Sequence, residues 1–284
     1  MGAVARVRIR GDMAMLDGTR GEAMDTNEQT DRADTEAPTR PFVVPSRDLA
    51  ANAPWRWLGL GWEDVRGAPL LTALFGGVIV LVSAAISWLA WSLGRFALLA
   101  TLLSGFVYVA PLIAVGLYSV SRARLAGQQP RLADSFVLAR RVLGHAGVFA
   151  LIQLVIILIW SRSGMMITAF VPVPAGDADA LIEFLAIGSV VGSIFAAITF
   201  AVAAFSLPMI ADRDIDMVTA CISSINAVLR NKPAMLMWAG IICVATAIGF
   251  ATALLGLGLV MPWLAYATFH AYRDTIDASA WPEV

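Results

Sequence analysis

Five long stretches of the chain contain no Asp, Glu, Lys or Arg, and this spacing constrains the fold more than any other feature. They cover residues 67–94, 96–121, 142–161, 184–211 and 233–272. The hydrocarbon core of a bilayer is about 30 Å thick and takes roughly 20 apolar residues per helix. Charged residues make up only 14% of the chain, against about 25% in ordinary soluble domains. The sequence therefore predicts an all-α, polytopic transmembrane helix bundle.

The last uncharged stretch decides the number of spans. Residues 233–272 are too long for one membrane helix at a rise of about 1.5 Å per residue, and a turn near residues 249–252 divides them into two. Residues 256–258 (Gly-Leu-Gly) are a second candidate turn, which would leave the last span short. We expect six spans, near residues 69–93, 96–120, 142–160 and 181–210, with two more inside 233–272. Five spans are the alternative.

Arginine and lysine positions predict the orientation, because cytoplasmic loops are enriched in both. With six spans, one side of the membrane carries Arg56, Arg66, Arg122, Arg124, Arg131, Arg140, Arg141, Arg213, Arg230, Lys232 and Arg273. The other side carries Arg95 and Arg162. Both termini are therefore predicted to lie in the cytoplasm.

The two ends of the chain are polar. Residues 1–50 cannot bury enough apolar area to offset their chain entropy, so they are predicted to form a disordered, acidic cytoplasmic tail. The six-helix domain then covers residues 51–277, and a short tail covers 278–284. A short helix is expected before the first span, with Trp55, Leu58, Trp62 and Val65 on its apolar face and Asp64 pointing away.

The loop over residues 212–232 holds the candidate partner-contact or structural residues. Residues 212–216 read Asp-Arg-Asp-Ile-Asp, which is similar to the start of a calcium loop. An EF-hand would need Gly at the sixth position and Glu at the twelfth, where Met217 and Ser223 stand, so that interpretation fails. Asp216 is instead expected to cap an amphipathic helix that begins at Met217. The residues that we single out are Asp212, Asp214, Asp216 and Arg230.

Pro111, Pro208 and Pro262 lie in the second, fourth and sixth predicted spans. Each proline removes a backbone donor and is expected to bend its helix. Bent helices can enclose a cavity, as in transporters. They can equally be ordinary kinks whose backbone groups find other partners.

A stripe of small residues on the fourth span indicates close helix packing. Gly188, Gly192 and Ala196 follow one another at intervals of four. Small side chains allow helix backbones to approach closely in membranes. The stripe can serve packing within one bundle or dimerisation.

No pattern in the sequence points to catalysis, a metal or a cofactor. The predicted mid-membrane positions carry no ionisable side chain, which argues against ion-coupled transport. His145 and His270 are the only histidines, and both are predicted near the cytoplasmic face. Two histidines can ligate a haem, but neither has further ligands at zinc-site spacing. We therefore expect no enzyme, and a net charge of −1 gives no reason to expect nucleic acid as a partner.

Several motifs resemble a known family. They are residues 110–118 (APLIAVGLY) leading to Ser121-Arg122, residues 208–216 (PMIADRDID), and residues 270–274 (HAYRD), with Gly61-Trp62 before the first span. Together they resemble the bacterial predicted integral membrane protein family, domain of unknown function 2189, over roughly residues 55–277. The resemblance implies a bundle in the bacterial inner membrane. Some members carry a cytochrome c oxidase label, but such a catalytic core needs more histidines than this chain has.

The leading hypothesis is a non-enzymatic membrane component that acts through its cytoplasmic loops on a partner or complex, or as a homo-oligomer. The first alternative is a small-molecule permease with a cavity at the proline-kinked helices. The second is an accessory or haem-associated subunit of a respiratory complex.

Overall fold

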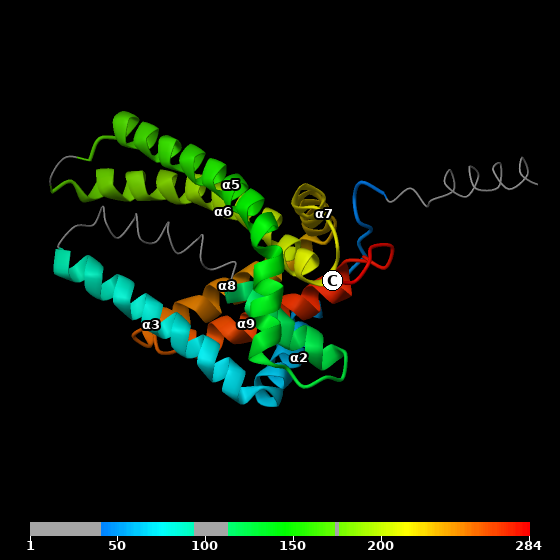
Figure 1. The fold of residues 1–284 in the computed structure, drawn as a ribbon. Helices are drawn as coiled ribbons and strands as arrows, with labels where there is room; N and C mark the ends of the chain where they lie inside the picture. The colour runs from blue at the N-terminus through cyan, green and yellow to red at the C-terminus, as the bar shows by residue number, and fades with distance from the viewer. Residues whose placement is uncertain (1–40, 94–112, 174–175) are drawn as a thin grey trace, which may run out of the picture. The chain divides into compact units, whose positions relative to one another are not determined.

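The computed structural model describes residues 41–93, 113–173 and 176–284, and within them the fold is all-α. Its helices are α2 (Ala53–Gly67), α3 (Pro69–Leu93), α5 (Leu132–Phe170), α6 (Ala178–Asp212), α7 (Met217–Arg230), α8 (Lys232–Ala251) and α9 (Leu257–Thr275) (Figure 1). Residues 113–125 are also helical. The described part of the chain contains no named strand, only isolated β-bridges that join Ser46 to Ile276 and Arg213 to Glu283.

Four of these helices are long and apolar enough to cross a membrane. The candidate spans are Pro69–Leu89, Gly147–Phe170, Ala178–Asp212 and Lys232–Ala251. They confirm the first, third, fourth and fifth predicted spans as apolar helices. Residues 94–112 of the predicted second span, with Pro111, lie outside the described residues. α9 forms where the sixth span was predicted, but it is not among the four, because its last turns carry polar and charged side chains such as His270 and Arg273.

The helix that contains the third predicted span begins earlier and ends later than expected. α5 starts at Leu132, so Arg140 and Arg141 lie on a helix and not in a loop. Ser135, Leu138 and Val142 repeat at helical spacing and are all buried. This buried face continues into the apolar part of α5. The helix therefore also includes Arg140 and Arg141, which were predicted to lie in the loop before it.

The division of residues 233–272 into two helices is confirmed, but the turn lies at residues 252–256, between the two predicted positions. Ala253 and Leu254 adopt left-handed backbone conformations, with φ of 51° and 72°. The Thr252 hydroxyl accepts a hydrogen bond from the Gly256 N–H group at 2.8 Å. The two left-handed positions of this turn are Ala and Leu, not glycine. The sequence therefore did not indicate where in residues 249–258 the turn would lie.

α9 is the most connected helix, since it packs against α2, α3, α6 and α8. Two glycines allow the close approaches. A Cβ atom added to Gly61 of α2 would lie 2.8 Å from the backbone nitrogen of Ala267. A Cβ atom on Gly76 of α3 would clash with the carbonyl oxygen of Gly258. Backbone-to-backbone packing of this kind excludes any larger side chain at these two positions.

The predicted apolar face of α2 is confirmed in part, since Leu58 and Val65 are buried, whereas Trp55 is 61% exposed. Trp57, which was not on the predicted face, is buried as well. The Trp57 ring meets Trp238 edge-on at 5.6 Å. Asp64, which was predicted to point away from the apolar face, is 4% exposed. The Asp64 prediction was wrong because α2 is covered by α9 and α8, so its packed face extends beyond the predicted apolar one.

Both ends of the described chain pack against the helices as extended segments. Arg47 N–H donates to Thr275 O at 2.8 Å, and Asp277 N–H donates to Pro45 O at 2.9 Å. Residues 45–47, which lie within the predicted tail, therefore contact the end of α9. Residues 278–284, predicted as a tail, return to the end of α6, where Val284 N–H donates to Asp212 O at 3.1 Å and Trp281 is only 5% exposed.

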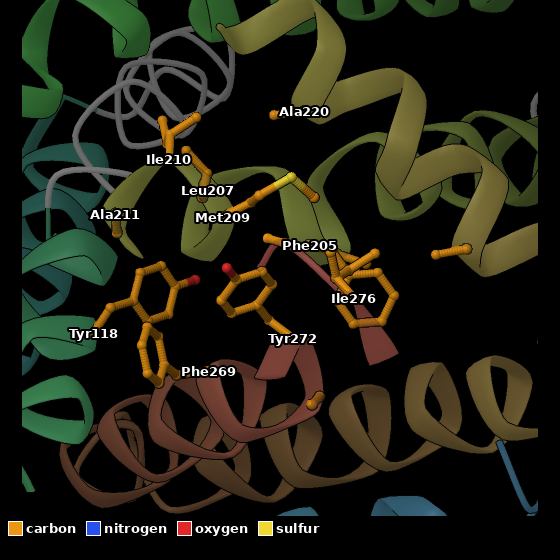
Figure 2. Packing of buried hydrophobic residues seen from close by; sticks show 14 of the residues in the cluster. Tyr118, Phe205, Leu207, Met209, Ile210, Ala211, Ala220, Phe269, Tyr272 and Ile276 are labelled. Carbon is orange, nitrogen blue, oxygen red and sulfur yellow. The ribbon is translucent and has the colours of Figure 1, made fainter. Parts of the chain in front are cut away.

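The largest core cluster joins the end of α6 to α9. Figure 2 shows Tyr118, Phe269 and Tyr272 gathered below the α6 residues Met209 and Ala211. The Tyr118 and Phe269 rings stack at 6.0 Å between centroids. This aromatic layer lies next to the charged residues described below.

Candidate functional site

Asp212, at the last turn of α6, is the centre of a buried ionic network. Its side chain is 3% exposed and accepts hydrogen bonds from the Tyr272 hydroxyl at 2.9 Å and from Arg273 Nη1 at 2.8 Å. Arg213 Nε lies 3.3 Å from the same oxygen, and Arg122 Nε lies 3.8 Å from the other. Arg122 also donates to the backbone oxygen of Val284. Asp212 is therefore surrounded by three cations and is not free to contact a partner.

Asp64 is the centre of a second buried network. Its carboxylate lies 2.8 Å from His270 Nε2 and accepts a hydrogen bond from Arg124 Nε at 2.7 Å. Burial acts to raise the pKa of Asp64, but the hydrogen bonds and charge of its partners outweigh burial and hold that pKa below its ordinary value of 3.8. Asp64 is thus an ionised, internally paired group at neutral pH.

The two networks are built from the same two helices. Arg122 and Arg124 lie two residues apart, as do His270 and Tyr272. Residues two apart on a helix point about 200° from one another. Within each of these pairs, one side chain therefore reaches Asp212 and the other reaches Asp64, and Arg273 of α9 adds a further contact to Asp212. This arrangement ties α6 and α2, which hold the carboxylates, to the ends of helix 113–125 and α9.

A polar cavity of about 420 Å³ opens beside Asp212. Its charged lining residues are Arg122, Asp134, Asp212, Arg273 and Glu283. Opposite charges already pair within it, since Asp212 binds both arginines and Glu283 accepts from Arg213 Nη2 at 2.9 Å. The lining carries two arginines and three carboxylates, and four of these five groups are already paired, which favours a role in holding the fold over capture of a free ion.

α7 begins as predicted. The Asp216 side chain accepts a hydrogen bond from Thr219 N–H at 2.9 Å, which confirms it as the N-cap of a helix that begins at Met217. Burial acts to raise the pKa of Asp216, but the backbone donors of the first turn hold it below its ordinary value. Asp214 and Arg230 are exposed. Of the four candidate residues, Asp212 and Asp216 thus have structural contacts, and the other two face outward.

The buried face of α7 is its small and polar one. Ala220, Ser223, Ser224 and Ala227 are fully buried, while Val218 and Leu229 are 49% and 56% exposed. Ser223 Oγ accepts from Val44 N–H at 2.9 Å. Small side chains bring α7 close to its neighbours and leave larger apolar groups on the outer surface.

Ser224 joins α7 to the backbone of α6. Its hydroxyl accepts from Phe205 N–H at 3.0 Å and donates to Ala201 O at 2.7 Å. An uninterrupted helix would bond these two backbone groups to each other. The Ser224 hydroxyl contacts α6 about one turn before Pro208. A side chain inserted between backbone groups and a proline are both recognised causes of helix bending. Sequence reasoning found the proline and missed the serine, because nothing local in residues 217–230 indicates it.

The other predicted kink and the glycine stripe have different surroundings. α9 continues through Pro262, and its residues Met261, Leu264 and Ala265 line an apolar cavity of about 250 Å³ together with residues of other helices. A Cβ atom added to Gly188 would meet no atom within 4 Å. The small-residue stripe of Gly188, Gly192 and Ala196 is thus open at Gly188, and its role in packing stays a prediction.

The two histidines lie in different settings. His270 is buried and its Nε2 atom is engaged by Asp64, whereas His145 is partly buried on α5. A haem iron would have to displace the Asp64 contact to bind that nitrogen. Within the described ranges, no three metal-ligating side chains gather at one place.

Comparisons with known proteins agree with the membrane character of these helices. No curated protein and no solved structure gives a significant match to the chain. The motif around residues 110–122 lies inside the one stretch that a family model matches, whereas the motif at residues 270–274 lies outside it. That stretch confirms the resemblance for residues 98–212, which match the family described as predicted integral membrane protein (DUF2189).

Proposed function

We propose that this integral membrane protein is a non-enzymatic component of the bacterial inner membrane that acts on a partner protein or complex through its cytoplasmic face. In this proposal the chain crosses the membrane six times, with both termini in the cytoplasm. The distribution of arginine supports the orientation. The surface that we assign to the partner is the outer face of α7 together with Asp214, which lies before the helix; its α7 residues are Val218, Leu229 and Arg230.

The observation that carries the proposal is the orientation of α7. Half-exposed Val218 and Leu229 lie on a helix whose inner face is bound through Ser223 and Ser224. Exposed apolar side chains bordered by charged ones are typical of protein contact surfaces. Because the inner contacts fix the helix, the outer face is already ordered before a partner binds, which lowers the entropy cost of association.

The two ionic networks support this role by stiffening the same region. The end of α6, which leads into α7, is held through Asp212 by Tyr272 and Arg273. The arginines around this carboxylate are engaged internally, so chemistry at Asp212 is not part of the proposal.

Co-purification from the native membrane tests the proposal. The affinity tag belongs on the N-terminus, because the Val284 backbone oxygen contacts Arg122 and a C-terminal tag would disturb it. We expect a reproducible partner with the wild type and at least a ten-fold lower yield of it with Val218→Ser/Leu229→Ser. Phe42→Ser, which alters another exposed apolar residue, is the matched control and keeps the partner. A chain that copurifies with no partner, or a partner kept by the double variant, would contradict the proposal.

A small-molecule permease is the second candidate, and the apolar cavity lined by Met261, Leu264 and Ala265 of the proline-containing helix α9 favours it. That cavity is lined mainly by apolar side chains from α3, α8, α9 and helix 113–125. Ala265→Phe would fill it without touching α7. If the variant abolishes uptake of an apolar solute into vesicles but keeps partner capture, the permease is the better description.

A further inference from the structure

The first part of α5 precedes the apolar span of this helix and has an exposed surface of its own. α5 contains 39 residues, which corresponds to about 58 Å at 1.5 Å per residue. A bilayer with its headgroups is only about 40–45 Å thick. The apolar span begins at Gly147. Residues 132–146 are therefore not needed to cross the bilayer and lie outside the spanning part of the helix.

This segment carries large apolar side chains on its outer face. Phe136 is 69% exposed, Val137 68% and Leu143 55%. The opposite face, with Ser135, Leu138 and Val142, is the buried one. Three exposed large apolar groups on so short a segment would be unfavourable in water, so the outer face requires a covering.

Two arginines share that outer face. Arg140 lies one turn after Phe136 and about one turn before Leu143, and Arg141 follows it. Both are exposed, and neither forms an ion pair with any residue that the structure describes. Long basic side chains above apolar ones are typical of helices that lie at a membrane interface, where the stem is buried and the charge reaches the headgroups.

The path of α5 allows this placement. Figure 1 shows the ribbon of α5 changing direction along its length, so the first turns do not continue the line of the later ones. A helix that bends between its two parts can cross the bilayer with one and follow its surface with the other.

We propose that residues 132–146 lie in the headgroup region and bind anionic phospholipid. Arg140 and Arg141 contact the lipid phosphates, and Phe136 and Val137 enter the acyl boundary. Charge complementarity selects lipid over a protein partner, since two arginines that form no ion pair within the described residues share a face with apolar side chains on a helix continuous with a span. The inference does not depend on the proposed function of α7.

Collision accessibility of a spin label tests the proposal on the full chain in nanodiscs. The label is attached at Ala133→Cys, an exposed position on the same face, with Cys221 and Cys243 replaced by Ala. We expect protection from a water-soluble nickel chelate and access to oxygen in phosphatidylcholine that contains phosphatidylglycerol. Arg140→Gln/Arg141→Gln should remove this protection and lower retained phosphatidylglycerol about ten-fold. Arg162→Gln, an exposed arginine later on the same helix and outside residues 132–146, is the matched control and should change neither result.

Two outcomes overturn the proposal. A label that the chelate reaches equally in all lipids would show that residues 132–146 project into water. Protection that persists in phosphatidylcholine alone, and in the double variant, would show that the covering is not anionic lipid. Gel-filtration profiles of the three variants that match the wild type show that a folding defect does not cause the change in protection.

Discussion

The His270 Nε2 atom lies 2.8 Å from an Asp64 carboxylate oxygen, although the two residues are 206 positions apart. Both are almost fully buried, and Arg124 completes the contact from a third helix. A buried carboxylate with two internal partners is stabilising only while it is ionised, and this gives it a dependence on pH that can be measured.

Asp64→Asn is predicted to lower stability by about 1.5–3 kcal/mol at neutral pH, since hydrogen bonds to a charged group are lost. The folded-state pKa of Asp64 lies below 3.8, so its contribution is present above about pH 4 and is lost as the pH falls through the folded value. Unfolding by detergent titration should show the wild type and variant converging in acid. A constant difference down to low pH would contradict this account.

Asp212→Asn is predicted to cost more, about 3–5 kcal/mol, because three arginines lose a common buried partner. Asp214→Asn, two residues away and exposed, is the control and should stay within about 0.5 kcal/mol of the wild type. The midpoint of thermal unfolding in detergent measures both. Equal effects from the two substitutions would mean that the Asp212 network does not stabilise the fold.

Gly76 and Gly77 are adjacent but have opposite surroundings. A Cβ atom on Gly76 clashes with Gly258 O, whereas one on Gly77 meets nothing within 4 Å. Gly76→Ala is predicted to destabilise the protein by about 1–3 kcal/mol, because α3 and α9 must separate. Gly77→Ala should be neutral or stabilising by up to about 1 kcal/mol, since alanine favours the helix. The stabilities of the two variants can be compared in one denaturation series. If Gly77→Ala is the less stable variant, the close approach of α3 and α9 is refuted.

Ser224→Ala removes the hydroxyl that lies between Phe205 N–H and Ala201 O. We predict a loss of about 1–3 kcal/mol, as buried backbone groups lose their partner. Ser193→Ala, whose hydroxyl bonds only within its own helix at an exposed site, is the control and should change stability by less than about 0.5 kcal/mol. If α6 simply closes its own backbone hydrogen bond, the Ser224 variant will match the control and the insertion will be shown to carry little energy.

Local patterns were enough for some features of this protein. The long uncharged stretches placed four apolar helices, and the spacing after Asp216 placed α7 with its cap. Each of these rests on residues close together in the chain, where helix periodicity and capping act.

The tertiary structure alone decided which polar groups meet. The sequence pattern placed Asp64 away from the apolar face of its helix and began the third span after Arg140 and Arg141. Residues 278–284 were predicted to form a tail. Asp64 is buried because α9 brings His270 to it, and the last residues are ordered because Arg213 and Arg122 bond to Trp281 O and Val284 O. Such contacts join residues 60 to more than 200 positions apart, so their partners depend on how helices pack and leave no signal in the local sequence.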